Sequence, residues 1–245
     1  MKSNRFRCLD IFWSLALCLT AGAQIGFDAA RASQLKIIQT EEAVFPLTLS
    51  HSTVLNGEVT VAIDVDQDGK LTDWLVTGYS RREFADSALS ALKRWRYEPP
   101  LLDGKRWASV QELHFDYSRT GVVVDMTAFE FLTNRMEALL AGRQAYRCHQ
   151  LGELDRLPTV LKVMSPGMPL PLGRDQSKHT VRVEFYIDET GKVRLPSVAR
   201  DVAASAYATA ALDAVKQWQF EPPLFQGKPV LVLARQDFNF VPPTR

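Results

Sequence analysis

The sequence predicts an α+β fold of two tandem ββαβ modules, each a three-stranded antiparallel sheet with a helix packed on one face, joined by a helical connector. Two observations lead to this prediction. Alternating hydrophobicity followed by an apolar helical stripe occurs twice, and a proline pair and a final β-rich run follow each stripe. The predicted boundaries are 1–23 for a signal peptide, 36–119 for the first module, 120–150 for the connector and 151–245 for the second module.

The first 23 residues have the pattern of a cleaved secretory signal. Basic residues open the chain, an apolar stretch of 13 residues runs from Ile11 to Ala23, and small residues end it. A membrane-spanning helix needs ~20 apolar residues, so cleavage and export to the periplasm are the predicted outcome. An uncleaved N-terminal anchor in the inner membrane is the alternative.

Charge and cysteine content exclude several classes of function. Loss of residues 1–23 removes three basic residues and one acidic residue, which changes the net charge from +1 to −1. A nearly neutral chain has no electrostatic attraction to nucleic acid, and the sequence has no phosphate loop or dinucleotide fingerprint. Neither a nucleic acid nor a small-molecule substrate is therefore predicted as a partner. Cys148 is the only cysteine after cleavage, so packing must hold the fold together without an intramolecular disulfide.

Each module begins with a predicted hairpin. The segments 57–66 and 180–188 alternate apolar and polar residues with period two, which is typical of a strand buried on one face. A turn with a glycine, Gly69 or Gly191, follows each segment, and a second β-rich run comes after it. The apolar residues of the two first strands are Val59, Val61, Ile63 and Val65, and Val181, Val183, Phe185 and Ile187.

A helix with one apolar stripe comes next in each module, and the two helices are 123 residues apart. The stripes are Phe84, Ala88, Leu89, Leu92 and Trp95, and Tyr207, Ala211, Leu212, Val215 and Trp218. Each helix is predicted to end at a proline pair, because proline cannot continue the hydrogen-bond ladder. A final strand closes each module, at 107–117 and at 229–240, and one more amphipathic helix is predicted over 126–143.

These repeated motifs resemble the C-terminal domain of TonB, the periplasmic end of the energy transducer that serves outer-membrane transporters. The resemblance rests on Trp-Arg-Tyr-x-Pro-Pro (95–100) and Asp-Gly-Lys (103–105), with the matching second copy, and it covers about 42–118 and 154–241. A TonB transducer also has an uncleaved membrane helix, a long proline-rich spacer and a single such domain. This sequence departs from all three features, so the resemblance implies a non-catalytic binding module rather than an energy transducer.

The resemblance further implies that the final strand of a module captures an extended peptide, such as the TonB box of a transporter, through main-chain hydrogen bonds at a sheet edge. The residues predicted to line these edges are Trp107, Ser109, Gln111, Leu113 and Phe115 in the first module, and Val230, Val232, Ala234, Gln236 and Phe238 in the second. The expected partner is an outer-membrane transporter or another envelope protein. The alternative is an envelope scaffold whose modules pair with each other or form a homodimer.

No catalytic, cofactor-binding or metal-binding residue is predicted, and no cofactor. Residues 64–69 match the first half of a calcium-binding loop, but Leu75 stands where that loop needs a glutamate. Cys148 and His149 are adjacent, and neighbouring residues do not generally aim their side chains at each other. The other histidines lack the spacing of metal ligands.

Overall fold

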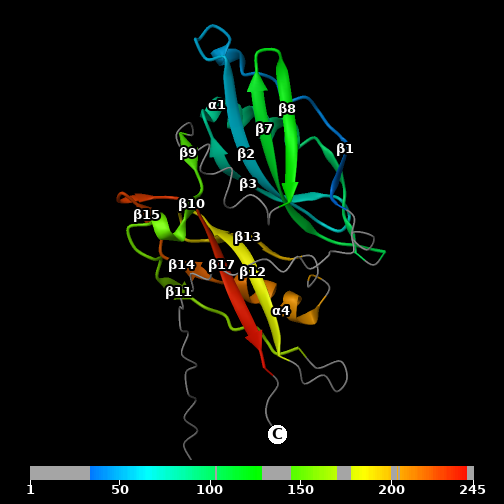
Figure 1. Ribbon diagram of the computed structural model, residues 1–245, viewed down its shortest axis with the longest axis vertical. Helices are drawn as coiled ribbons and strands as arrows, with labels where there is room; N and C mark the ends of the chain where they lie inside the picture. The colour runs from blue at the N-terminus through cyan, green and yellow to red at the C-terminus, as the bar shows by residue number, and fades with distance from the viewer. Residues whose placement is uncertain are drawn as a thin grey trace, which may run out of the picture.

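The computed structural model describes residues 34–102, 104–128, 145–169, 178–199, 203 and 205–241. These residues form two units, one above the other in Figure 1, and the α+β class predicted from the sequence is confirmed. The first unit comprises residues 34–128 and the second unit residues 151–241. The connector segment, residues 145–150, joins them. Neither α-helix of the described ranges is long and apolar enough to cross a membrane.

The first unit is built around a five-stranded sheet with the strand order β8-β7-β2-β3-β9, in which all neighbours are antiparallel. Two short two-stranded sheets, β1 with β4 and β5 with β6, accompany it. The elements are β1 (Lys36–Gln39), η1 (Leu47–Leu49), β2 (Asn56–Val65), β3 (Leu71–Tyr79), α1 (Arg82–Leu92), β4 (Arg96–Glu98), β5 (Leu101–Leu102), β6 (Lys105–Arg106), β7 (Ser109–Ser118) and β8 (Gly121–Ala128).

The second unit has a four-stranded sheet with the order β10-β17-β12-β13, in which only the β10–β17 pair is parallel. Two-stranded sheets again accompany it, β11 with β14 and β15 with β16. Its elements, with those of the connector segment, are β9 (Tyr146–Arg147), β10 (His149–Gln150), η3 (Leu151–Glu153), β11 (Val160–Lys162), β12 (His179–Ile187), β13 (Val193–Val198), α4 (Ala206–Val215), β14 (Gln219–Phe220), β15 (Leu224–Phe225), β16 (Lys228–Pro229) and β17 (Val232–Phe240).

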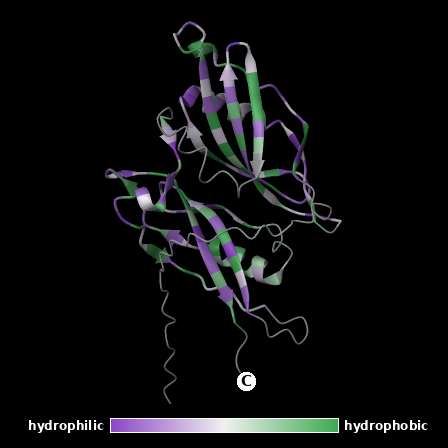
Figure 2. Cartoon of the chain, in the orientation of Figure 1, coloured by the Kyte–Doolittle hydropathy of each residue, from purple (hydrophilic) through white to green (hydrophobic). Residues whose placement is uncertain are grey.

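One helix covers one face of each sheet, and the alternating hydropathy of the strands explains why (Figure 2). In the first unit Val59, Val61 and Ile63 are fully buried together with Phe84 and Leu92 of α1. The second core has the same construction, with the alternate residues of β12 and β17 packed against α4. Burial of apolar side chains on this shared face is the main contribution to the stability of each unit.

The two units repeat the same stabilising contacts. The indole Nε1 of Trp95 donates to the carbonyl of Glu41 at 2.8 Å, and Nε1 of Trp218 donates to the carbonyl of Met164 at 2.8 Å. Both the donors and the acceptors are 123 residues apart. Each tryptophan therefore fixes the segment that precedes the first long strand of its unit.

The hairpin turns are fixed by an aspartate and a glycine. The Asp188 carboxylate accepts hydrogen bonds from the backbone amides of Thr190 and Lys192, both at 3.0 Å, and Asp66 makes the same contacts in the first unit. Gly191 has φ +82°, and a Cβ placed on it would overlap the carbonyl oxygen of Phe220. Glycine is required here both for its backbone conformation and for this close approach.

Several expectations about the elements are wrong. The sheets have five and four strands rather than three, because β8, β9 and β10 add to them. Both helices end before the proline pairs, since the residues after each helix turn into β4 and β14, which pair with β1 and β11. The sequence predicts a helical connector, but 121–128 form β8, 146–147 form β9 and 149–150 form β10. The predicted helix over 126–143 is therefore wrong for 126–128, and its remainder lies outside the described residues.

The faces of the two sheets that the helices leave open pack against each other at one end. Ala62 of β2 is fully buried there in a cluster with Tyr186, Leu195 and Leu231 of the second unit. At the edge of this cluster the Arg194 guanidinium donates to the Asp73 carboxylate at 2.5 and 3.1 Å and to the carbonyl of Trp74. The two units thus share a small apolar interface closed by an ion pair.

Replacement of Gly191 by alanine should lower the free energy of unfolding by roughly 2–4 kcal/mol, because the new Cβ meets the Phe220 carbonyl in addition to the strain of a positive φ. Gly227 provides a matched control, since it has φ +72° and a Cβ added to it would have no atom within 4 Å. Gly227→Ala should cost only about 1 kcal/mol. Denaturant unfolding followed by circular dichroism measures both, and equal losses would contradict the steric explanation.

Candidate peptide-binding edge

The final strand of the first unit, β7, is not a sheet edge. It pairs with β2 along its whole length, and β8 pairs with its other side from Gln111 to Ser118. The prediction that this strand presents an exposed edge is therefore wrong. The prediction fails because the hairpin at 118–121 returns the chain along β7 as strand β8, whereas the sequence predicts a helical connector there. Of the five residues named for this edge, Gln111, Leu113 and Phe115 are buried, Ser109 begins β7, and Trp107 precedes it.

The final strand of the second unit, β17, is paired differently. β12 pairs with it from Val232 to Phe240 on one side. On its other side, called here the outer side, β10 pairs in parallel only at Val232 and Leu233. From Ala234 to Phe240 no strand of the described ranges pairs with this outer side. This stretch is called the open edge.

The backbone groups on the outer side belong to every second residue. The His149 amide donates to the carbonyl of Leu231 at 2.8 Å, which places the Leu231 carbonyl on the outer side. Because successive residues of a strand turn their backbone groups to opposite sides, the outer amides of the open edge are those of Arg235, Asp237 and Asn239.

The sequence prediction selects the other set of residues. Val232, Ala234 and Phe238 are buried in the core of the second unit, and Gln236 lies between them in the same alternation. Val230 lies before β17, and its amide donates to the carbonyl of Pro223. The prediction follows hydrophobicity, which identifies the residues that face the helix. The residues whose amides point outward have exposed polar side chains, so a hydrophobic pattern does not identify them.

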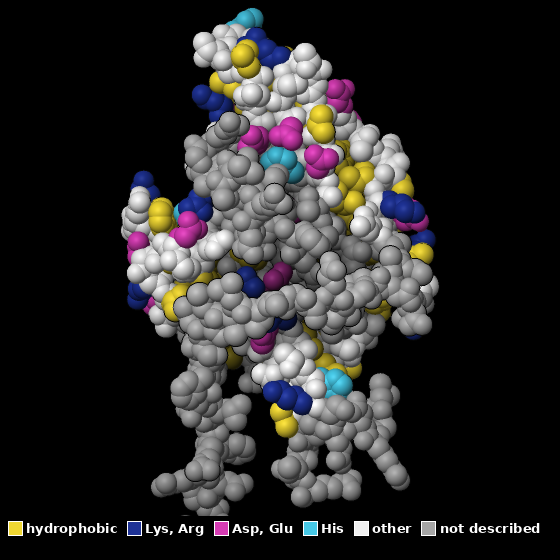
Figure 3. All heavy atoms as spheres, in the orientation of Figure 1, with side chains coloured by type: hydrophobic (Ala, Val, Ile, Leu, Met, Phe, Trp, Pro, Cys, Tyr) yellow, Lys and Arg dark blue, Asp and Glu magenta, His cyan; other side chains and the backbone are white. Residues whose placement is uncertain are grey.

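The side chains of these outward residues form a polar ladder on the open face of the sheet. The Arg182 guanidinium donates to both oxygens of Asp237, at 2.7 and 3.0 Å, and Thr180 donates to Asn239 at 2.8 Å. The hydrogen bond from Arg182 lowers the pKa of Asp237. Basic and acidic side chains are visible over this lower part of the sheet in Figure 3. The ladder is exposed, so it contributes little stability and keeps the open edge hydrated.

The connector segment changes from one sheet to the other between two consecutive residues. The Cys148 amide donates to the carbonyl of Thr77 in the first sheet, and the next amide, of His149, donates to Leu231 in the second. The Tyr146 ring stacks on Tyr79, and its hydroxyl donates to Glu189 of the second unit at 2.5 Å. The connector segment thus ties the edge of β3 to the start of β17.

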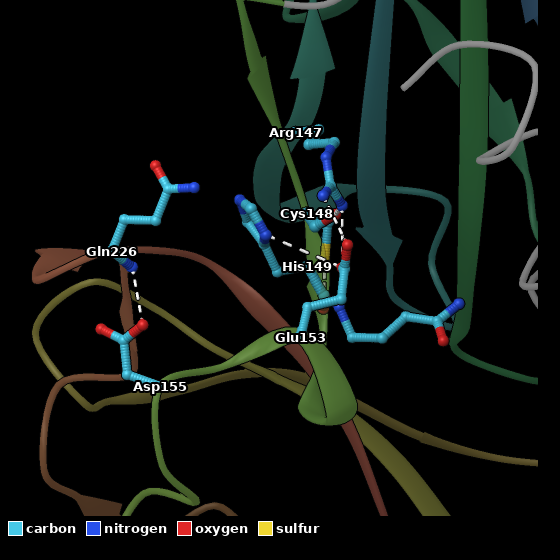
Figure 4. A network of polar contacts seen from close by, with 7 residues as sticks. Arg147, Cys148, His149, Glu153, Asp155 and Gln226 are labelled. Atoms are coloured by element: carbon cyan, nitrogen blue, oxygen red, sulfur yellow. Dashed lines mark hydrogen bonds and ion pairs between the residues drawn. The ribbon is translucent and has the colours of Figure 1, made fainter. Parts of the chain in front are cut away.

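A polar network holds the connector segment in place (Figure 4). The Arg147 guanidinium makes two hydrogen bonds to the Glu153 carboxylate, at 2.5 and 2.8 Å, and the same carboxylate accepts from the Gln150 amide at 2.8 Å. The hydrogen bonds from Arg147 are the main reason why the pKa of Glu153 falls to about 2. Glu153 therefore remains ionised at any physiological pH, and it forms a capping box with Gln150 at the start of η3, where the chain leaves β17.

Neighbouring loops complete this end of the site. Asp155 accepts hydrogen bonds from the amides of Gln226 and Gly227 at 2.8 and 2.7 Å, which fixes the turn between β15 and β16 (Figure 4). The His149 ring packs on Phe225 with 4.6 Å between ring centres, and burial lowers the pKa of His149. The open edge therefore has one rigid end, beside β10, and one end near the C-terminus.

The two motifs weighed from the sequence as sites of other chemistry have ordinary structural contacts. Asp66, in the supposed calcium loop, is engaged by the amides of its own turn. Cys148 lies in the apolar interface between the units while His149 packs on Phe225, so the two side chains have different surroundings. Within the described ranges, no group of three or more histidine, cysteine or acidic side chains has the arrangement needed to hold a metal ion.

Glu153→Gln should weaken the attachment of β10, because it removes the charge that Arg147 binds. Hydrogen exchange of the His149 amide should be about fivefold faster at pH 7, as expected for loss of a partly exposed ion pair. Since the pKa of Glu153 is lowered to about 2 from 4.5, its contribution is complete above pH 4.5 and is lost as the pH falls towards 2. The difference between variant and wild type should therefore shrink over that range.

Asp213→Asn is the matched control for this change, because Asp213 is an exposed carboxylate whose ion pair with Lys216 is distant from the connector segment. It should leave exchange at His149 unchanged. A Glu153→Gln effect of equal size at pH 7 and pH 3 would show that charge does not hold the connector segment.

Comparison with known families agrees with this architecture. The chain matches the family model described as Gram-negative bacterial TonB protein C-terminal over residues 50–118 and again over residues 175–242. No curated protein sequence matches the chain. Each match begins before the first long strand of a unit and ends with β7 or β17. The two matches together cover more than half of the chain, which therefore belongs to the TonB C-terminal domain family and carries two tandem copies of its domain.

Proposed function

We propose that this chain is a periplasmic TonB-like binding protein that captures extended peptides of outer-membrane transporters, or of other envelope proteins, by strand addition at the open edge of β17. The family is a transport-related, non-enzymatic domain of the Gram-negative envelope. The observation that carries the proposal is the unpaired outer side of Ala234–Phe240 within the described ranges. An edge of this kind offers amide donors and carbonyl acceptors to an added strand.

The two units have different roles in this proposal. In the first unit β8 pairs with the outer side of β7, so no place remains for a peptide on the last strand of the repeat, β7. In the second unit β10 pairs only with the first two residues of β17. The second unit is therefore the binding unit, and the first unit supports it through the shared interface and the connector segment.

Export through cleavage of residues 1–23 is part of the proposal and lies outside the described residues. Sequencing of the exported protein tests it directly. A mature chain that begins near Gln24 agrees with a periplasmic protein, whereas retention of residues 1–23 favours the alternative of an inner-membrane anchor.

A scaffold role is the second candidate, and one observation favours it. The two units already pack against each other through Ala62, Tyr186, Leu195 and Leu231. In that case the open edge pairs with a second copy of the chain, and the mass in solution rises with concentration and does not respond to peptide.

Arg235→Pro tests strand addition. Proline removes the outward amide of residue 235 and leaves the pairing with β12 intact, as proline does on edge strands. Binding of a TonB-box peptide, measured by calorimetry, should weaken at least about tenfold. Arg235→Ala, which keeps the amide and removes the exposed side chain, should change the dissociation constant less than about threefold.

Circular dichroism and the melting temperature establish that both variants remain folded. A folded Arg235→Pro variant that binds as tightly as the wild type would exclude main-chain pairing at this edge. Absence of any peptide binding by the wild type, together with a concentration-dependent mass, would favour the scaffold role.

A further inference from the structure

His149 is a buried side chain with an unused hydrogen-bonding atom. Only 7% of the residue is exposed, and its Nδ1 is buried without a hydrogen-bond partner in the described part of the chain. A carboxylate oxygen of Glu153 lies 3.7 Å from this Nδ1, which is too far for a hydrogen bond. A buried polar atom without a partner costs free energy. A phenylalanine at this position would avoid that cost, so packing alone does not explain the polarity of the ring.

The backbone of the same residue attaches β10 to β17. The His149 amide donates to the carbonyl of Leu231 at 2.8 Å, and β10 pairs with only the first two residues of β17. The preceding amide, of Cys148, already belongs to the first sheet, where it donates to the carbonyl of Thr77. A displacement of the His149 ring would therefore act directly on the short pairing that joins the connector segment to the second sheet.

Two charged groups from neighbouring elements act on the His149 ring. The Arg147 guanidinium of β9 and the Glu153 carboxylate of η3 bind each other beside it (Figure 4). The residues next to it from β15 and β17 are the uncharged Phe225, with 4.6 Å between ring centres, and Val232. Burial is the main cause that lowers the pKa of His149, Arg147 lowers it further, and Glu153 opposes both. The attached ring is thus favoured in its neutral form.

Acid consequently favours detachment of β10. An imidazole released into water takes up a proton near its ordinary pKa of 6.5, whereas the attached ring does so only at lower pH. As the pH falls through 6.5 the released state binds more protons, so the equilibrium shifts towards it. Glu153, with a pKa of about 2, and Arg147 keep their charges over this range. The charge that changes in this network is therefore that of His149.

We propose that His149 is an acid-sensitive latch, in which protonation of the ring releases β10 from β17 while the connector segment stays bound to the first sheet. Release frees the carbonyl of Leu231 and the outer side of Val232 and Leu233. The unpaired stretch of β17 then begins at the start of the strand instead of at Ala234. The latch sets the length of the open edge, and it does so whether or not the proposed function holds.

Hydrogen exchange of the full chain from residue 24 onwards tests the latch. The protection factor of the His149 amide, which corrects for the intrinsic pH dependence of exchange, should fall at least about fivefold between pH 8 and pH 5. The protection factor of Val183, a fully buried residue of β12, should change less than about twofold. A fall of equal size at both amides would mean that acid unfolds the whole second unit, and it would overturn the latch.

His149→Phe is the matched variant, because phenylalanine keeps an aromatic ring beside Phe225 and cannot take up a proton. Protection of the amide of residue 149 should then vary less than about twofold between pH 8 and pH 5. His51→Gln removes an exposed histidine of the first unit and should retain the full pH dependence. A His149→Phe variant with the pH dependence of the wild type would assign the change to another group and overturn the latch.

An NMR titration of the wild type decides the question even if His149→Phe fails to fold. The ring resonances of His149 should titrate with a midpoint below pH 6.5, and the amide resonances of Val232 and Leu233 should shift with the same midpoint. A midpoint at or above 6.5 would show that attachment does not disfavour the proton. Either that result or a ring titration without shifts at Val232 and Leu233 would overturn the latch.

Discussion

The hydrogen-bonding groups on the outer side of the last strand of each unit are the constraint on which the rest of the structure depends. Backbone amides and carbonyls must find partners in protein, water or ligand. In the first unit β8 supplies the hydrogen-bond partners for β7. As a result β7 is an internal strand, and Phe115 and Tyr117 are buried. In the second unit β10 supplies such partners for only two residues of β17. One strand therefore distinguishes the two copies of the domain, because β7 is an internal strand and β17 keeps a stretch without a strand on its outer side.

The interface between the units shows that the second sheet is shaped to meet the first. Leu195 has φ +47°, a conformation that is costly for a residue with a side chain, by about 1–2 kcal/mol. It lies where the pairing of β13 with β12 shifts register, and its side chain is buried against Tyr186, Leu231 and Ala62. Burial of a leucine contributes about 1.5–3 kcal/mol, which offsets that cost. Part of that burial comes from the first unit, through Ala62 of β2.

The sequence is informative where a periodic pattern has one physical cause. The long strands and both helices follow from burial of one face, and the duplication makes each prediction independent evidence for the other. β8 escapes prediction because 126–143 also has helical periodicity, and because Val122–Val124 lack the polar alternation of an edge strand. The two-residue strands of the connector segment are too short to leave a pattern. The residues predicted for the edge of the second module fall on the alternation that faces the helix, since outward amides are a property of the backbone, which hydrophobicity does not report.

If the proposed strand addition operates, duplication resolves a conflict between binding and protection of a sheet edge. An open edge is needed to receive a strand, yet it leaves the sheet less covered and exposes it to unwanted pairing. Here the first unit contributes a well-buried core, and the Arg147–Glu153 network holds the connector segment beside the open edge without covering it. Arg235 and Asp237 place charges along the open edge, which disfavour association with hydrophobic strands of arbitrary sequence. Their amides remain turned outward, so these residues also leave the backbone of the open edge accessible to the strand addition that we propose.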